Sequence, residues 1–219
     1  MRKNYDNQLN ELKEELVKMG KTVNQAIKKT VRALKNNDLD GAKEVIAEDA
    51  RIDEAERNIE NACLKIILTQ QPVASDMRVV SSALKMITDL ERMGDFAADI
   101  AEIVESGGKT KTAYVSPFLL KMSAAVVKMV EDALLSFTER DLELAKAVCR
   151  ADDEVDGLFI GAKDSLVDLI RRDESYSERA LDLMMVSKYL ERIGDHATNL
   201  AEWVIYSLTG EHINTEKGF

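Results

Sequence analysis

Carboxylate side chains recur at matching places in the two halves of this 219-residue chain. The string LERMGD at 90–95 returns as LERIGD at 190–195. Residues four apart share one face of a helix, so each string begins a narrow acidic stripe. Like charges at this spacing repel by ~0.2–0.5 kcal/mol per pair. The same repulsive spacing occurs at matching places in both halves, which suggests that a bound cation offsets the repulsion.

Acids upstream of the first string are placed to meet it. Asp49 and Asp53 precede a predicted turn near Pro72, and two helices joined by a short turn pack antiparallel. Asp53 lies as far before the turn as Glu91 lies after it, and Asp49 is matched to Asp95 in the same way. The first half is therefore predicted to bring these carboxylates to similar heights on neighbouring helices.

The second half repeats the arrangement with one change. Across a turn near 174, residues 156 and 191 agree in height within about two residues, as do residues 152 and 195, and all four are acids. The first stripe ends at Asp99, whereas the second ends at Asn199. An amide is a neutral and weaker ligand, so the two halves are not expected to be equivalent.

Carboxylates without histidine or cysteine are hard oxygen ligands, which suit Mg²⁺, Ca²⁺, Mn²⁺ or iron better than a structural zinc. The Glu-x-x-His motif of di-iron bundles is absent from the sequence. His196 follows Asp195 and so points ~100° away from the stripe, which favours a flank position beside Arg192 over a ligand role. A plain solvated acidic face has the same spacing. Spacing alone leaves both interpretations open, and the duplication favours metal binding.

Long helices must position these acids. Apolar periodicity predicts an all-α fold of six helices, roughly 4–34, 38–68, 75–106, 116–139, 141–172 and 177–208 (or from 175). Asp38, Ser116 before Pro117, and Asp141 are predicted N-caps. The segments 37–43 and 140–146 also match, so each half reads as one three-helix unit. The linker-like stretch 108–115 sets the domains at 1–108 and 109–219, two tandem three-helix bundles.

Composition excludes several classes of protein. A net charge of −10 argues against nucleic-acid binding, which needs clustered cations. The sequence has no apolar run of the ~18 residues that a membrane helix needs, and its N-terminus does not resemble a signal peptide. Cys63 and Cys149 lie among apolar residues and are expected to be reduced, buried thiols of a cytoplasmic protein.

The glycines inside the repeated strings are a further shared feature. A glycine within a helix costs ~1 kcal/mol relative to alanine. Gly94 and Gly194 therefore indicate either a close helix approach or room for a ligand.

These features together resemble the PhoU family of phosphate-uptake regulators. The resemblance rests on the tandem three-helix units, the repeated strings and the segment QPVASDMR at 71–78, and it covers nearly the whole chain. It implies a cytoplasmic protein, often a homodimer, that acts as a negative regulator of the phosphate-starvation response. Such proteins link the ATPase of the phosphate ABC transporter to a membrane sensor histidine kinase, so this chain would meet a membrane only through partners.

The resemblance also implies metal clusters on the acidic motifs. Carried over to this sequence, the implied ligands are Asp49, Asp53, Glu91, Asp95, Asp99, Asp152, Asp156, Glu191, Asp195 and Asn199.

Two other functions remain open from the residues. The alternatives to a regulator are a helical scaffold with solvated acids and a metal-dependent phosphate-ester hydrolase. Ser-His-Asp, phosphate-loop and Cys-x-x-Cys motifs are absent from the sequence, so a non-enzyme is expected.

Overall fold

The computed structural model describes residues 2–107 and 114–212, which form six α-helices and one short 3₁₀ helix. The predicted all-α fold of two tandem three-helix bundles is confirmed. The predicted linker lies mostly outside the described residues. The helices are α1 (Arg2–Asn36), α2 (Leu39–Gln70), α3 (Ala74–Gly107), α4 (Pro117–Glu139), α5 (Leu142–Arg172) and α6 (Ser177–Thr209), with η1 (Glu174–Tyr176) before α6.

Local chemistry sets most helix ends. Asp38 accepts a hydrogen bond from the Gly41 amide at the start of α2, and Asp141 caps α5 in the same way. Ser116 precedes Pro117 at the start of α4, but its hydroxyl makes no cap and lies 2.8 Å from the Ser165 hydroxyl on α5. The three predicted N-cap positions are therefore confirmed, and the side-chain capping hydrogen bond forms at α2 and α5 but not at α4.

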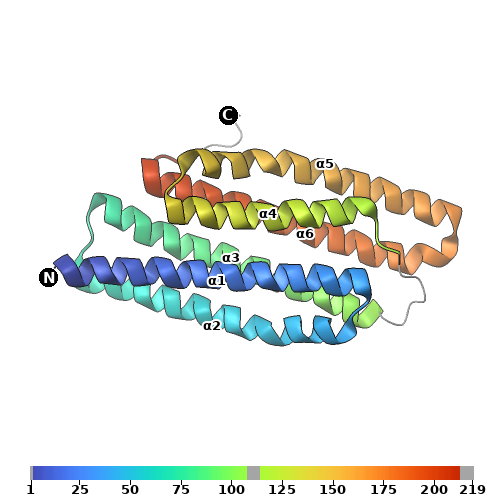
Figure 1. The fold of residues 1–219 in the computed structure, drawn as a ribbon, viewed down its shortest axis with the longest axis horizontal. Helices are drawn as coiled ribbons and strands as arrows, with labels where there is room; N and C mark the ends of the chain where they lie inside the picture. Colours follow the sequence, from blue (N-terminus) through green and yellow to red (C-terminus); the bar gives the residue numbers. More distant parts are fainter. Residues whose placement is uncertain (1, 108–113, 213–219) are drawn as a thin grey trace.

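The two bundles lie side by side (Figure 1). In each, the first helix packs against the other two, and α3 packs antiparallel to α6 at the centre. The α2–α3 turn and the α5–α6 turn lie at opposite ends of the molecule. One continuous apolar core runs through both bundles, so the α3–α6 contact holds the two acidic stripes in fixed positions.

Candidate metal centre

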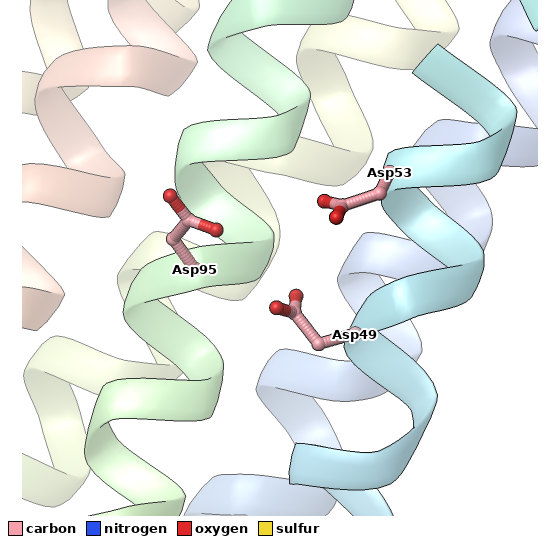
Figure 2. A group of neighbouring side chains, drawn as sticks. All are labelled: Asp49, Asp53 and Asp95. Atoms are coloured by element: carbon pink, nitrogen blue, oxygen red, sulfur yellow. The ribbon is translucent and has the colours of Figure 1, made fainter. Parts of the chain in front are cut away.

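Three aspartates converge between α2 and α3. Asp49 and Asp53 on α2 and Asp95 on α3 each offer an oxygen atom within 4.8 Å of the others. Figure 2 shows the three side chains pointing into the space between the helices. The predicted match in height of Asp49 and Asp95 across the turn is what brings them together.

A glycine allows the two helices to approach at this level. A β-carbon on Gly94 would lie 2.9 Å from the Ile52 Cδ1 atom and 3.4 Å from an Asp49 carboxylate oxygen. The glycine therefore permits the close helix contact, and the same contact brings the Asp49 carboxylate against α3.

Burial and mutual repulsion disfavour the ionised form of the carboxyl groups at this site. Desolvation, with the nearby charges of Asp95, Asp53 and Asp99, raises the pKa of Asp49 to about 6. Desolvation and the charge of Asp95 also raise the pKa of Glu91. A bound cation would relieve both effects.

Two further acids extend this surface. Desolvation raises the pKa of Glu56, which lies on α2 three residues after Asp53 and was not among the predicted ligands. Desolvation also raises the pKa of Asp99, helped by Glu102 and opposed by a hydrogen bond from Tyr189 on α6.

One arginine already faces the first site. The Arg92 Nη1 atom lies 3.2 Å from an Asp95 oxygen, and its Nε atom lies 3.6 Å from a Glu91 oxygen. The Arg92 side chain is 56% exposed, and an exposed pair contributes ~0.2–1 kcal/mol. Such a contact is too weak to neutralise the cluster.

The second half reproduces the arrangement more loosely. Desolvation and the charges of Asp195 and Asp156 raise the pKa of Asp152 to about 6. A β-carbon on Gly194 would lie 3.3 Å from the Val155 Cγ1 atom, as one on Gly94 would lie against Ile52. Within the described residues, however, only the first-half trio meets the 4.8 Å spacing.

Cations in the second half sit on the two α6 acids. Lys188 forms an ion pair with Glu191, and the Arg192 Nη1 atom lies 4.0 Å from Asp195. Desolvation and Glu191 nevertheless raise the pKa of Asp195.

Asn199 turns toward α3. Its amide nitrogen donates to an Asp89 oxygen at 3.1 Å, and the His196 Nδ1 atom lies 2.8 Å from the same oxygen. The sequence placed His196 on a flank of α6 beside Arg192; the structure places it against α3. Asp89 was absent from the sequence-based candidates.

Two hydrogen-bonded pairs cross the α3–α6 contact, and their residues occupy equivalent positions in the two halves. Asp99 on α3 accepts a hydrogen bond from Tyr189 on α6, whereas Asn199 on α6 donates to Asp89 on α3. Asp99 and Asn199 are equivalent positions a hundred residues apart, as are Asp89 and Tyr189, so the pair at Asn199 has its carboxylate on the facing helix rather than on the stripe. Comparing the two halves for such paired differences would have revealed Asp89.

The two cysteines are not part of the candidate site. Cys63 and Cys149 are free and buried, and desolvation raises the pKa of each thiol to about 12. Both are therefore neutral thiols at physiological pH. The donors at the candidate centre are carboxylate oxygens, which fit hard cations.

Two fused three-helix bundles, each with an acidic surface between its second and third helices, define a class of duplicated all-helical proteins. The comparisons with known proteins place the chain within that class. The PhoU domain model matches residues 16–104 and again residues 119–204, and the chain belongs to the PhoU family.

Relatives match over nearly their whole length. A phosphate-specific transport system accessory protein PhoU homolog from Clostridium acetobutylicum is 36% identical over 97% of this chain and 98% of its own. One from Aquifex aeolicus, with the same name, is 40% identical over 93% of this chain and 92% of its own.

Solved structures agree with the fold. The crystal structure of PhoU from Pseudomonas aeruginosa has a TM-score of 0.90 at 34% identity, covering 94% of this chain and all of that one (100%). The phosphate transport system regulatory protein PhoU from Streptococcus pneumoniae has a TM-score of 0.89 at 27% identity, covering 96% and 99%. None of the helices in the described ranges is long and apolar enough to cross a membrane.

Proposed function

We propose that this protein is a negative regulator of phosphate uptake and of the phosphate-starvation response. It acts as an adaptor between the ATPase of a phosphate ABC transporter and a sensor histidine kinase. The observation that supports this most strongly is the match of both halves to the PhoU domain, together with full-length relatives named as accessory proteins of phosphate transport. Relatives carry accessory or regulatory names rather than enzyme names, which supports a role in contact rather than in turnover.

Hard cations on the acidic surfaces organise the adaptor in this proposal. Asp49, Asp53 and Asp95 would hold the cation of the first half, with Glu91 and Asp99 beside them. The raised pKa of Asp49 supports this, because ionising that carboxyl is unfavourable until a positive charge arrives. Iron, Mn²⁺, Mg²⁺ or Ca²⁺ fits the oxygen donors.

The second half would bind its cation more weakly. Asp152, Asp156, Glu191 and Asp195 supply its carboxylates, but Lys188 and Arg192 already contact two of them. Asn199 is turned toward Asp89 and contributes no charge.

The protein works in the cytoplasm in this proposal, as a homodimer, and reaches the membrane through its partners. Phosphate itself would need a bridging cation to approach surfaces of this charge.

A phosphatase reporter of the starvation response tests the regulatory role. In ample phosphate, deleting the chain should switch the reporter on, and restoring the unmodified chain should switch it off. An unchanged reporter in the deletion strain would contradict the proposal.

Metal content separates the adaptor from a plain scaffold. The purified chain should retain iron or Mn²⁺ after dialysis, and Asp53→Asn with Asp95→Asn should lose the metal of the first half. The matched control is Asp164→Asn, because Asp164 is exposed on α5 and makes no ion pair within the described part of the chain. Equal metal content in all three proteins would reject the assigned ligands.

A further inference from the structure

A groove between α1 and α4 lies away from the acidic centre. The two helices run antiparallel along one face of the molecule (Figure 1), and α1 lies behind α2 and α3 when the aspartates are viewed (Figure 2). Two adjoining cavities of 490 and 390 Å³ form the groove and share Val17, Lys21, Gln25 and Thr138. The groove is therefore continuous along several turns of α1.

The floor of the groove is apolar. Val17 is half-buried, Leu134 and Phe137 are 6% and 8% exposed, and Leu135 at the edge is 49% exposed. A β-carbon on Gly20 would lie 2.4 Å from the Leu134 Cδ2 atom, so this glycine lets α4 come close to α1. The floor can receive a ridge of apolar side chains.

The rim of the groove is cationic, although the whole chain carries a net charge of −10. Its charged lining residues are Lys13, Glu14, Lys18, Lys21, Lys28 and Glu131. Lys28 is paired with Glu131 at 2.5 Å, and Lys18 lies 3.5 Å from Glu15.

Two of these lysines have no acidic partner. Lys13 and Lys21 make no ion pair among the described residues. From residue 16 to residue 36, α1 carries no acid at all. Glu14 also lines the groove and makes no ion pair among the described residues, so the unpaired charge on the rim is that of two lysines and one glutamate. This net positive charge favours acidic residues on whatever occupies the groove.

We propose that this groove docks an acidic amphipathic helix of a partner protein. The stretch from Lys13 to Lys28 spans about 22 Å, the length of about four helical turns. A helix entering it would place apolar residues at i, i+3 or i+4, and i+7 on the floor, and its Asp and Glu residues against Lys13 and Lys21.

Charge and shape distinguish this occupant from others. A flat lipid surface does not reach a recessed floor, and the acidic remainder of the chain repels nucleic acid. The inference rests on the proposed function only in taking the occupant to be a partner protein, and the metal centre has no part in it.

Peptide binding is the first test. The probe is a fluorescein-labelled helical peptide of about 18 residues, with leucines on one face and glutamates on its flanks. Binding is followed by fluorescence anisotropy. Lys13→Glu with Lys21→Glu should weaken binding by about tenfold or more. A peptide with lysines in place of the glutamates should not bind.

The matched control is Lys65→Glu with Lys163→Glu, which makes the same charge change at exposed lysines on α2 and α5. Equal weakening by both variant pairs would show a general charge effect and overturn the assignment. Equal binding of both peptides would do the same.

Crosslinking in cells is the second test and does not depend on the peptide design. Benzoylphenylalanine replaces Leu135, and the adduct is mapped by mass spectrometry. The expected result is an acidic amphipathic helix of another protein, lost when Lys13 and Lys21 are reversed. Adducts with lipid or with a second copy of this chain, or no adduct, would overturn the proposal.

The reporter of the deletion strain tests the proposed function separately, so the two proposals fail independently.

Discussion

Replacing Asp49 with asparagine should stabilise the metal-free protein near neutral pH. Asp49 is partly buried between α2 and α3, with Asp53 and Asp95 close by. Desolvation and these neighbouring charges raise its pKa from 3.8 to about 6. The folded state therefore disfavours the ionised carboxylate, and asparagine keeps the shape without the charge.

The size of the effect follows from the shift in pKa. A rise of ~2 units at 1.36 kcal/mol per unit gives about 3 kcal/mol. Asp49 is partly exposed, and solvent screening reduces this to about 1–1.5 kcal/mol in the free energy of unfolding.

The sign depends on pH. A carboxyl with a raised pKa in the folded state binds its proton more tightly there than in the unfolded chain. Ionisation therefore destabilises the fold progressively between about pH 4 and pH 6, and fully above that range. The gain from Asp49→Asn should be near zero at pH 4 and complete at about pH 7.5.

Urea unfolding followed by circular dichroism, with EDTA present, measures this gain. Asp164→Asn is the control, and its stability should match the unmodified chain at both pH values. A variant no more stable than the original at about pH 7.5, or equally stabilised at both pH values, would refute the electrostatic reasoning.

Bound metal should reverse the order of stability, so that the unmodified chain is more stable than Asp49→Asn. At a Mn²⁺ concentration about a hundred times the dissociation constant, the unmodified chain gains about 2.7 kcal/mol. Asp49→Asn should lose most of that gain. Identical shifts of melting temperature in the two proteins would mean that Asp49 does not bind the metal.

Further predictions concern the helix contacts and the second half. Gly94→Ala should lower the free energy of unfolding by about 1–2 kcal/mol in urea titrations, because the new methyl group meets Ile52. Gly157→Ala, which meets nothing within 4 Å, should instead raise it by about 0.5–1 kcal/mol. Asn199→Asp should destabilise the fold by about 1–2 kcal/mol, because it sets a second carboxylate against Asp89. Adding Asp89→Asn should restore most of that stability, and a double-mutant cycle in which the two changes simply add would contradict the contact.

The sequence predicted the helices well because their ends are locally determined. Asp38 and Asp141 cap α2 and α5 where the pattern placed them, and the left-handed residues Asn37, Gln71 and Arg140 end the preceding helices. Two starts were predicted for α6, at 175 and at 177. The helix begins at Ser177, because the short helix η1 occupies residues 174–176.

For the first acidic site, the sequence predicted the level of the carboxylates along the helices but not which of them converge. Counting residues from the α2–α3 turn matched Asp49 with Asp95 and Asp53 with Glu91. The structure draws Asp49, Asp53 and Asp95 into one group. Spacing along the chain sets the height of each carboxylate, whereas the rotation of the packed helices decides which carboxylates point inward. At this level the helices approach closely because Gly94 has no side chain.

The contact between the bundles was beyond local reasoning. Nothing in the period of either helix says that α3 faces α6, and therefore that Asp89 meets Asn199 and His196. Only differences between the two halves carried that information. Position 99 is Asp while 199 is Asn, and position 89 is Asp while 189 is Tyr.

These paired differences show how the two halves complement each other at the α3–α6 contact. Each of these two polar pairs joins a carboxylate on α3 to a neutral side chain on α6, Asp99 with Tyr189 and Asp89 with Asn199. The second stripe ends in an amide at Asn199, and Asp89 on α3 supplies a carboxylate beside it. Without Asp89, the Asn199 amide would lack its acceptor in a partly buried contact, where an unsatisfied polar group costs about 1–3 kcal/mol. The surroundings of the second acidic stripe thus depend on a side chain from the first bundle, so the two bundles act as one unit rather than as interchangeable copies.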